Sequence, residues 1–380
     1  MAKALVTGGA GFVGSHIVDR LLQDGYAVRI LDALDERVHP NGKPVWVSNE
    51  AEFVQGDVRD PQTVARALQG VQVVFHEAAY QDYMPDFSRF LHVNSVSTAL
   101  IFESILANHL EVEKVIVASS QAVYGEGQYC CMNPTCAMKG QIVQPPTRGQ
   151  GQMQTGQWEI LCELCGQPME ALRLREEYAN PYNAYAISKF AEELAAVRLG
   201  RLHDIPSVAL RYSIVQGPRQ SLFNQYSGIC RIFSLRLLND LPPVIYEDGR
   251  QTRDFTHIQD VVDANMAVLR DPRADFQVFN VGSGQSLAVL DYARTLIRKL
   301  GKSIPPLVPG EFRVGDNRNS VSDISRLQSL GWRPRHGIED ILDDYLGWIR
   351  QQDSLESYFR DAENLMKQAG VVQKVLTQSA

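Results

Sequence analysis

Residues Ala4–Asp32, ALVTGGAGFVGSHIVDRLLQDGYAVRILD, decide the fold of this chain. A short apolar strand runs directly into a turn with glycines at positions 8, 11 and 14, and apolar residues then recur at helical spacing from Phe12 to Leu22. Such glycines permit the tight turn, the close approach of a pyrophosphate, and close packing of the helix on the sheet. The helix N-terminus then faces the phosphates. The stretch predicts a dinucleotide-binding unit, with cofactor contacts from Gly8, Gly11, Phe12, Val13 and Gly14.

The second strand of this unit, Ala27–Leu31, ends at an acid, Asp32. A carboxylate at that strand tip accepts hydrogen bonds from the adenosine ribose hydroxyls and repels a 2′-phosphate. Asp32 therefore predicts NAD rather than NADP as the cofactor.

Beyond this unit, short apolar strands alternate with helical stretches, a pattern typical of a parallel sheet covered by helices on both faces. We expect strands at 53–58, 71–75, 114–118 and 207–211, and helices that begin near 61, 87 and 182. With 380 residues the chain is long for one core, so a second, smaller domain is expected. Further cofactor contacts are predicted at strand ends and on the helix that starts near 87: Asp57, Val58, Ala78, Ala79 and Asn94.

Composition restricts the partners and the location. A formal net charge of −7 argues against nucleic acid as a partner. The N-terminus lacks the apolar core of a signal peptide, and no run approaches about 18 apolar residues, so we expect no membrane partner and a cytoplasmic location. Five of the six cysteines fall between Cys130 and Cys165. In a reducing compartment such a cluster indicates metal rather than disulfides.

Two separated segments carry the candidate catalytic residues. Ser120 follows a predicted strand, at the edge where open α/β sheets place their ligands. Tyr185 and Lys189 are four residues apart on a predicted helix and therefore share a face. A phenol needs a pKa shift of roughly three units, about 4 kcal/mol, to become a base near neutrality. We expect the Lys189 ammonium and a positive nicotinamide ring to supply it in a partly dry cleft.

Eight segments of the chain occur in the order typical of one known family. They are TGGAGFVG at 7–14, Asp32, GDV at 56–58, His76–Ala79, SSQAVYG at 119–125, YAISK at 185–189, RDFTHIQDV at 253–261 and NVGSG at 280–284. In these segments the chain resembles the extended short-chain dehydrogenase/reductases, specifically the NAD-dependent nucleotide-sugar epimerases and dehydratases. The resemblance implies a Rossmann domain that holds NAD permanently, with Ser120, Tyr185 and Lys189 as the catalytic group.

The resemblance also implies how the chain divides. Residues 1–211 would form the NAD-binding Rossmann domain, interrupted by a cysteine-rich insertion at 128–177. Residues 212–380 would bind the sugar nucleotide, with 252–269 packing back on the Rossmann domain. A homodimer would form through helices at 87–108 and 182–201. The substrate residues implied are Tyr80, Ser120, Arg219, Asn224, Arg253 and Arg313. Arg253 and Arg313 match positions that meet the diphosphate, which guanidinium groups bind well.

Departures from the family pattern narrow the reaction. Dehydratases of the family usually carry an Asp-Glu pair where this chain has Gln121 and Ala122. Neither residue can protonate a leaving hydroxyl, so sugar dehydration is disfavoured. The glutamate common in decarboxylases is also missing at Ala122, and Asp32 opposes an exchangeable NADP. Ile214 replaces an asparagine that often lies near the diphosphate, which removes one expected contact.

The insertion carries the predicted metal site. A C-x-x-C-G turn at 162–166 is the usual knuckle of a zinc ribbon, and Cys131 and Cys136 offer the partner pair. Four thiolates would bind a structural zinc ion in a closed site and order a segment that has little core of its own. Cys130 is a possible substitute ligand, and redox or chance cysteines are the alternative. The insertion resembles a subgroup of the family, the dTDP-L-rhamnose 4-epimerases.

The reaction expected is therefore a 4-epimerisation. Tyr185 would take the proton of the sugar 4-hydroxyl while hydride leaves C4 for nicotinamide, with Ser120 bonding the same oxygen and Lys189 keeping the phenolate accessible. The keto sugar would rotate about its anchored diphosphate and take the hydride back. Two alternatives remain open at this point: another reaction of the family, such as dehydration, decarboxylation or release of the keto sugar by an oxidoreductase, and a non-catalytic NAD-binding regulator.

Overall fold

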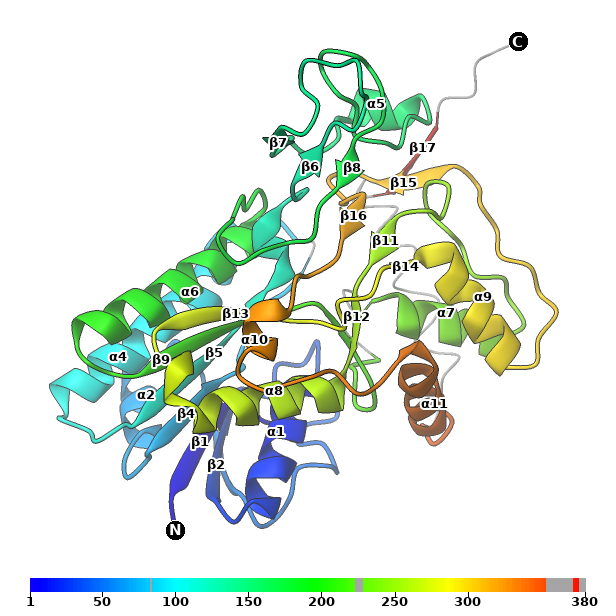
Figure 1. Cartoon of the computed structure of the whole chain (residues 1–380). Helices are drawn as coiled ribbons and strands as arrows, with labels where there is room; N and C mark the ends of the chain where they lie inside the picture. The colour runs from blue at the N-terminus through cyan, green and yellow to red at the C-terminus, as the bar shows by residue number, and fades with distance from the viewer. Residues whose placement is uncertain (83, 223–227, 353–371, 376–380) are drawn as a thin grey trace.

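A seven-stranded parallel sheet forms the centre of the computed structural model, which describes residues 1–82, 84–222, 228–352 and 372–375 (Figure 1). The strand order is β13-β9-β5-β4-β1-β2-β3. This is a doubly wound arrangement: the chain adds β2 and β3 on one side of β1 and then adds β4 and the later strands on the other side. The strands are β1 Lys3–Thr7, β2 Ala27–Asp32, β3 Glu52–Gln55, β4 Val73–His76, β5 Lys114–Ser120, β9 Ser207–Tyr212 and β13 Gln277–Val281. The predicted Rossmann-type sheet is present.

Helices cover both faces of this sheet because its strands are apolar on both sides. On one face, α1 Phe12–Gln23 and α8 Ile258–Arg270 pack on residues such as Val6 and Ile116. On the other face, residues such as Leu5 and Val117 pack against three further helices. These are α2 Pro61–Ala67, α4 Ser97–Ala107 and α6 Ala184–Leu202.

One helical run differs from a regular α-helix. The predicted helix 87–108 is built from α3 Phe87–Phe90, a π-helical segment η1 Leu91–Val96, and α4. By length and composition alone, the segment Phe87–Ala107 is long and apolar enough to cross a membrane. It packs along α6 as a helix of the Rossmann layer, and slightly under half of its most apolar part is buried there.

The remainder of the chain builds a smaller unit beside the sheet. Its core gathers α7 Ile229–Leu238, α9 Val289–Lys299 and α11 Ile338–Ile349 around Tyr292 and Phe255. Its short strands are β10 Ile214–Gln216, β11 Thr252–Arg253, β12 Phe255–His257, β14 Leu287–Ala288, β15 Glu311–Arg313, β16 Asn319–Ser320 and β17 Val372–Lys374. Two further short helices, η3 Pro272–Ala274 and α10 Ser325–Gln328, pack on the Rossmann sheet rather than in this core. Both α8 and β13 return to the sheet, so the Rossmann layer draws on residues beyond the expected return segment 252–269.

The cysteine-rich insertion forms a small body of its own between β5 and α6. After η2 Gln121–Tyr124, its elements are β6 Tyr129–Cys130, β7 Ile142–Val143, α5 Gln150–Gln154 and β8 Glu170–Ala171. β6 pairs with both β7 and β8. Figure 1 shows this body against β15 and β16, at the end of the molecule where the smaller unit meets the sheet.

Candidate active site

A cavity of about 1070 Å³ opens at the carboxyl ends of β1, β2, β4, β5 and β9, between the sheet and the smaller unit. This edge is where open α/β sheets bind their ligands. Predicted site residues that line it are Gly8, Gly11, Phe12, Val13, Gly14, Asp32, Asp57, Val58, Ala78, Ala79, Tyr80, Ser120, Tyr185, Lys189, Arg219, Arg253 and Arg313. Residues that are far apart in the sequence thus share one cavity.

The glycine turn fits a pyrophosphate. Gly8 has φ +67°, and a Cβ at this position would lie 2.7 Å from the backbone nitrogen of Ala78. A Cβ on Gly14 would collide with the carbonyl of Gly8, so helix α1 lies close against the turn. No side chain caps the first turn of α1, so its amides remain available to an anion at the cavity wall.

The remaining cofactor positions surround this turn. The carboxylate of Asp32 accepts hydrogen bonds from the amides of Ala10 (3.0 Å) and Leu34 (2.9 Å), which fixes it at the tip of β2. Asp57 lies beside it on the cavity wall and pairs with Arg59. These residues fit the adenosine end of NAD, which when bound supplies hydride acceptance and return.

Asn94 has a different environment from the other cofactor positions. It is fully buried in η1, and its amide bonds the backbone of Tyr80 through both atoms and the hydroxyl of Ser188 at 2.8 Å. Asn94 therefore ties the loop after β4 to the helix that carries Tyr185. Its predicted contact with NAD stays a prediction.

The candidate catalytic group comes together as expected from its placement on strand and helix. Ser120 ends β5, and Tyr185 and Lys189 project from the first turns of α6. Tyr185 hydrogen-bonds Ser120, and the positive charge of Lys189 acts to lower the pKa of its phenol. The ammonium of Lys189 donates to the carbonyl of Ala118 at 2.7 Å, which holds α6 against the end of β5.

The pKa of Tyr185 is governed mainly by its burial. Burial raises this pKa, and the opposing effects of Lys189 and Ser120 do not compensate for it. The protein's own groups therefore leave the phenol above its ordinary pKa. The lowering that a base requires, from Lys189 together with a positive nicotinamide ring, stays a prediction.

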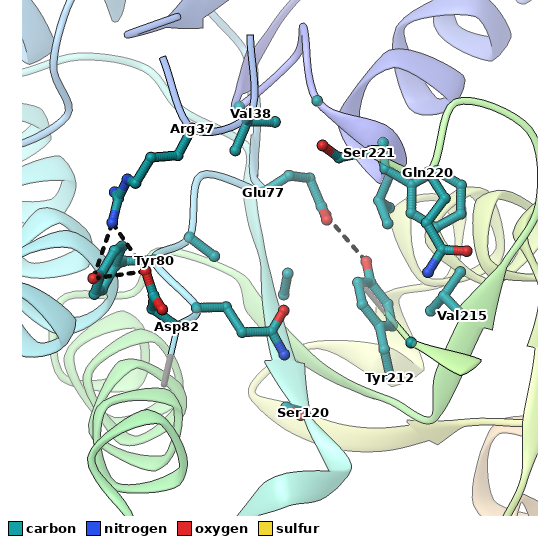
Figure 2. A pocket seen from close by; sticks show the side chains of 18 of the residues that line it. Arg37, Val38, Glu77, Tyr80, Asp82, Ser120, Tyr212, Val215, Gln220 and Ser221 are labelled. Atoms are coloured by element: carbon teal, nitrogen blue, oxygen red, sulfur yellow. Dashed lines mark hydrogen bonds and ion pairs between the residues drawn. The ribbon is translucent and has the colours of Figure 1, made fainter. Parts of the chain in front are cut away.

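Two acids that the sequence analysis missed contribute to this electrostatic balance. Glu192 is fully buried, and its Oε2 lies 2.7 Å from Nζ of Lys189. Glu77 lines the cavity and accepts a hydrogen bond from the hydroxyl of Tyr212 at 3.0 Å (Figure 2). Burial raises the pKa of Glu77 to about 7. The contact between Glu192 and Lys189 could have been predicted from the sequence, because residues three apart on a helix share a face.

The predicted substrate residues divide into two groups. Arg253 ends β11 and Arg313 ends β15, strands of two different small sheets, and both arginines line the cavity. Arg219 lines it as well and pairs with Asp19 of α1 at 2.8 Å. Asn224 lies outside the described residues. These arginines provide the positive charge expected for a diphosphate.

Tyr80 lies elsewhere in the cavity. Its hydroxyl bonds Arg37, Asp82 and Asp86, and the guanidinium groups of Arg37 and Arg89 both approach the face of its ring within 5 Å. Figure 2 shows Tyr80 on the wall with Arg37 and Asp82, away from Ser120. Its role in sugar binding stays a prediction.

Comparison with known proteins gives this site a family. A model of the NAD-dependent epimerase/dehydratase family matches residues 4–142 and 162–282, more than half of the chain. The chain belongs to the NAD-dependent epimerase/dehydratase family. The predicted family is thereby confirmed, and its enzymes include 4-epimerases of the type predicted.

Individual members of the epimerase/dehydratase family resemble the whole chain. The dTDP-L-rhamnose 4-epimerase of Burkholderia thailandensis is 36% identical over 359 residues, which cover 92% of this chain and 95% of that protein. Two solved structures align with a TM-score of 0.73 over 92% of this chain and 99% of theirs. They are the UDP-glucose 4-epimerase of Thermotoga maritima with UDP-glucose, 27% identical, and the UDP-glucuronic acid 4-epimerase of Bacillus cereus with UDP-glucuronic acid and NAD, 25% identical.

The family match omits residues 143–161, which lie in the insertion. The four predicted ligands, Cys131, Cys136, Cys162 and Cys165, do come together there: their sulfur atoms all lie within 4.8 Å of one another. The thiol of Cys130 contacts the carbonyl of Cys131 at 3.8 Å. The structure therefore shows a four-cysteine cluster in this epimerase-family chain, with Cys130 outside it.

Proposed function

We propose that this chain is an NAD-dependent nucleotide-sugar 4-epimerase and that its substrate is dTDP-L-rhamnose or the 4-epimer of that sugar. The observation that supports the activity is one cavity that joins the glycine turn, the Ser120–Tyr185–Lys189 group and Arg253. The substrate is inferred from the relative in Burkholderia thailandensis, at 36% identity.

The chain's own residues would act on the sugar as follows. Arg253 and Arg313 hold the diphosphate, so the sugar turns about a fixed end. Tyr185 takes the proton from the 4-hydroxyl, and Ser120 hydrogen-bonds the same oxygen. Bound NAD supplies the acceptance and return of hydride at C4. Tyr185 then returns its proton to the oxygen, now on the other side of C4.

Within the family, the residues after Ser120 favour epimerisation over dehydration. Gln121 and Ala122 line the cavity, and neither ionises. The carbonyl oxygen of Gln121 accepts a hydrogen bond from Ser320 at 3.0 Å, which fixes its amide. A 4,6-dehydration needs an acid to protonate the departing hydroxyl, and these two positions supply none.

One incubation distinguishes these reactions. The enzyme, without added cofactor, would be mixed in deuterium oxide with dTDP-L-rhamnose carrying deuterium at C4. We expect a near-equilibrium mixture of the two 4-epimers, with deuterium retained at C4 and little solvent label on carbon, because hydride returns to the carbon it left. Loss of the C4 label, or a keto sugar accumulating with reduced cofactor, would contradict the activity. Label-retaining epimerisation of another nucleotide hexose, with dTDP-L-rhamnose inert, would contradict only the substrate.

We further propose that the four-cysteine cluster holds a structural zinc ion. The Sγ pairs Cys131–Cys165 and Cys136–Cys162 are each 3.8 Å apart. Tetrahedral zinc with Zn–S bonds of about 2.3 Å requires a sulfur separation of about 3.8 Å. The backbone amides of Asn133, Met138 and Gln167, each two residues after a cysteine, point at the sulfur atoms. Such amides stabilise thiolates, the form that binds metal.

Assembly and location remain proposals. We infer a cytoplasmic protein, because none of the six cysteines is paired in a disulfide, which is usual in a reducing compartment. We also infer a homodimer through α4 and α6, whose outer faces expose Leu106, Ile187 and Leu194. Light scattering should show Leu194→Asp as a monomer. The control Leu307→Asp, which alters an exposed leucine of the smaller unit, should remain a dimer.

A further inference from the structure

One buried arginine of the insertion, Arg148, bonds a loop that lines the cavity. Its guanidinium makes a two-pronged pair with Glu247 of the smaller unit, with N···O distances of 2.8 and 2.9 Å. The same group donates to the backbone carbonyl of Asp316 at 2.7 Å. The side chains of Arg148 and Glu247 are 0% and 1% exposed. A residue of the insertion is therefore locked to the loop that follows β15.

A second buried arginine strengthens this connection. Arg318, at the end of the same loop, bonds Glu247 at 2.9 Å and Glu159 of the insertion at 2.5 Å. Its backbone amide donates to Glu126, two residues before the insertion, at 2.7 Å. The carboxylate of Glu247 is thus shared by Arg148 and Arg318, one from each side of the boundary.

The loop that follows β15 also contacts Arg253, one of the two predicted diphosphate arginines. The guanidinium of Arg253 donates to the carboxylate of Asp316 at 2.9 Å and to the carbonyl of Asn317 at 2.8 Å. Burial raises the pKa of Asp316, but the charges of Arg253, Arg313 and Arg148 together hold it below its ordinary value. The positive charges of both predicted substrate arginines and of the insertion arginine therefore act on the same carboxylate, that of Asp316.

We propose that Arg148 is a positioning residue for the sugar nucleotide: through Glu247 and Asp316 it fixes the orientation in which Arg253 meets the diphosphate. The inference rests on the proposed function of this site. It assigns the insertion a role in substrate binding in addition to its own folding. Because a fork-shaped guanidinium binds phosphate oxygens only in a defined orientation, loosening its anchor weakens diphosphate binding and leaves the Ser120–Tyr185 geometry intact.

The geometry also explains why a charged group is used here. Buried ion pairs contribute little net stability, because removing both charges from water costs about as much as their attraction returns. Their directional hydrogen bonds, however, select one arrangement of the groups. Arg148 can hold the Asp316 carbonyl and Glu247 at once, which an apolar side chain of the same volume cannot do.

The test compares Arg148→Gln with Arg148→Lys and with a matched control, Arg173→Gln. Arg173 is an exposed arginine of the insertion that donates to the carbonyl of Gly284, away from the loop that follows β15. Glu247 retains Arg318 as a partner when Arg148 is replaced, so Arg148→Gln should fold. Arg148→Lys keeps the charge and is measured as well, in case the glutamine variant does not fold.

The readouts are the Kd of dTDP by calorimetry, the NAD content of the purified protein, and kcat and KM with the nucleotide sugar. For Arg148→Gln we expect the dTDP Kd and the KM to rise about threefold to thirtyfold. NAD content and kcat should match the wild type, Arg148→Lys should be intermediate, and Arg173→Gln should be unchanged.

Several outcomes would overturn the inference. One is a folded Arg148→Gln variant with wild-type dTDP affinity; if only Arg148→Lys folds, its wild-type affinity has the same meaning. Parallel losses of NAD, kcat and dTDP binding would show that Arg148 supports the fold in general. Failure of the wild-type protein to bind dTDP or UDP would instead remove the proposed diphosphate site itself, and the role of Arg148 with it.

Discussion

Glu192 lies 2.7 Å from the ammonium of Lys189, and both groups are fully buried beneath the candidate active site. Lys189 is the cation that should make Tyr185 a base, and the neighbouring carboxylate offsets part of its field. Burial raises the pKa of Glu192, and its ion pair with Lys189 opposes that rise. The acid–base balance of the site thus involves Glu192 and Glu77 in addition to Tyr185 and Lys189.

We expect Glu192→Gln to make Tyr185 easier to ionise. The carboxylate of Glu192 raises the pKa of Tyr185, so its removal should shift the acidic limb of the kcat/KM profile toward lower pH by about one unit. The exposed Glu113→Gln substitution serves as the control. An unchanged acidic limb in the Gln variant would show that Glu192 does not influence the base.

Tyr185→Phe should retain the fold and bound NAD but lose turnover by several orders of magnitude, because phenylalanine has no hydroxyl to act as the base beside Ser120. Absorbance of the purified protein reports NAD, and a coupled assay reports turnover. Tyr26→Phe, far from the cavity, should be normal. Turnover near the wild-type rate in Tyr185→Phe would exclude the phenol as the base.

Asp32→Asn should weaken retention of NAD and reduce discrimination against NADP. The amide keeps the size of the carboxylate but loses the charge that repels a 2′-phosphate. Both cofactors would be measured after release from the purified protein. Asp24→Asn, at the end of α1, is the matched control. Tight NADP binding by the wild-type protein would contradict the ribose assignment.

Zinc should be present at about one ion per chain, and the double variant Cys162→Ser, Cys165→Ser should lose it and loosen residues 128–177. Elemental analysis and proteolysis are the measurements. Cys130→Ser and Cys230→Ser should both keep the metal, since neither sulfur belongs to the cluster. A metal-free protein with an ordered insertion would refute the zinc proposal.

Glu77 should make the protein less stable as pH rises. Its pKa in the folded chain is about 7, above the ordinary value of 4.5. Between these values the unfolded chain releases a proton that the folded chain keeps, so the free energy of unfolding falls as pH rises through this window. Glu77→Gln should reduce that fall by about 1–3 kcal/mol in denaturant titrations from pH 4.5 to 7.5. The exposed Glu50→Gln should leave the slope unchanged, and a similar slope in Glu77→Gln would contradict the raised pKa.

Local patterns in the sequence determined much of this site. The strand, glycine turn, helix and Asp32 lie within 29 consecutive residues, and helical spacing alone places Tyr185 and Lys189 on one face. Ser120 could be placed because the carboxyl ends of parallel strands meet at one edge. The cysteine cluster could also be predicted locally, because short spacings and a knuckle glycine fix the backbone around each cysteine pair.

Tertiary structure alone decided which distant groups meet. Glu77 and Tyr212 are 135 residues apart, and Arg148 and Glu247 are 99 apart, yet each pair is bonded. No periodicity in the chain relates such positions, because their approach depends on how whole layers pack. The burial that raises the pKa of Tyr185 could not be read from the sequence for the same reason: desolvation depends on every element that closes over the phenol, and this is a property of the assembled fold.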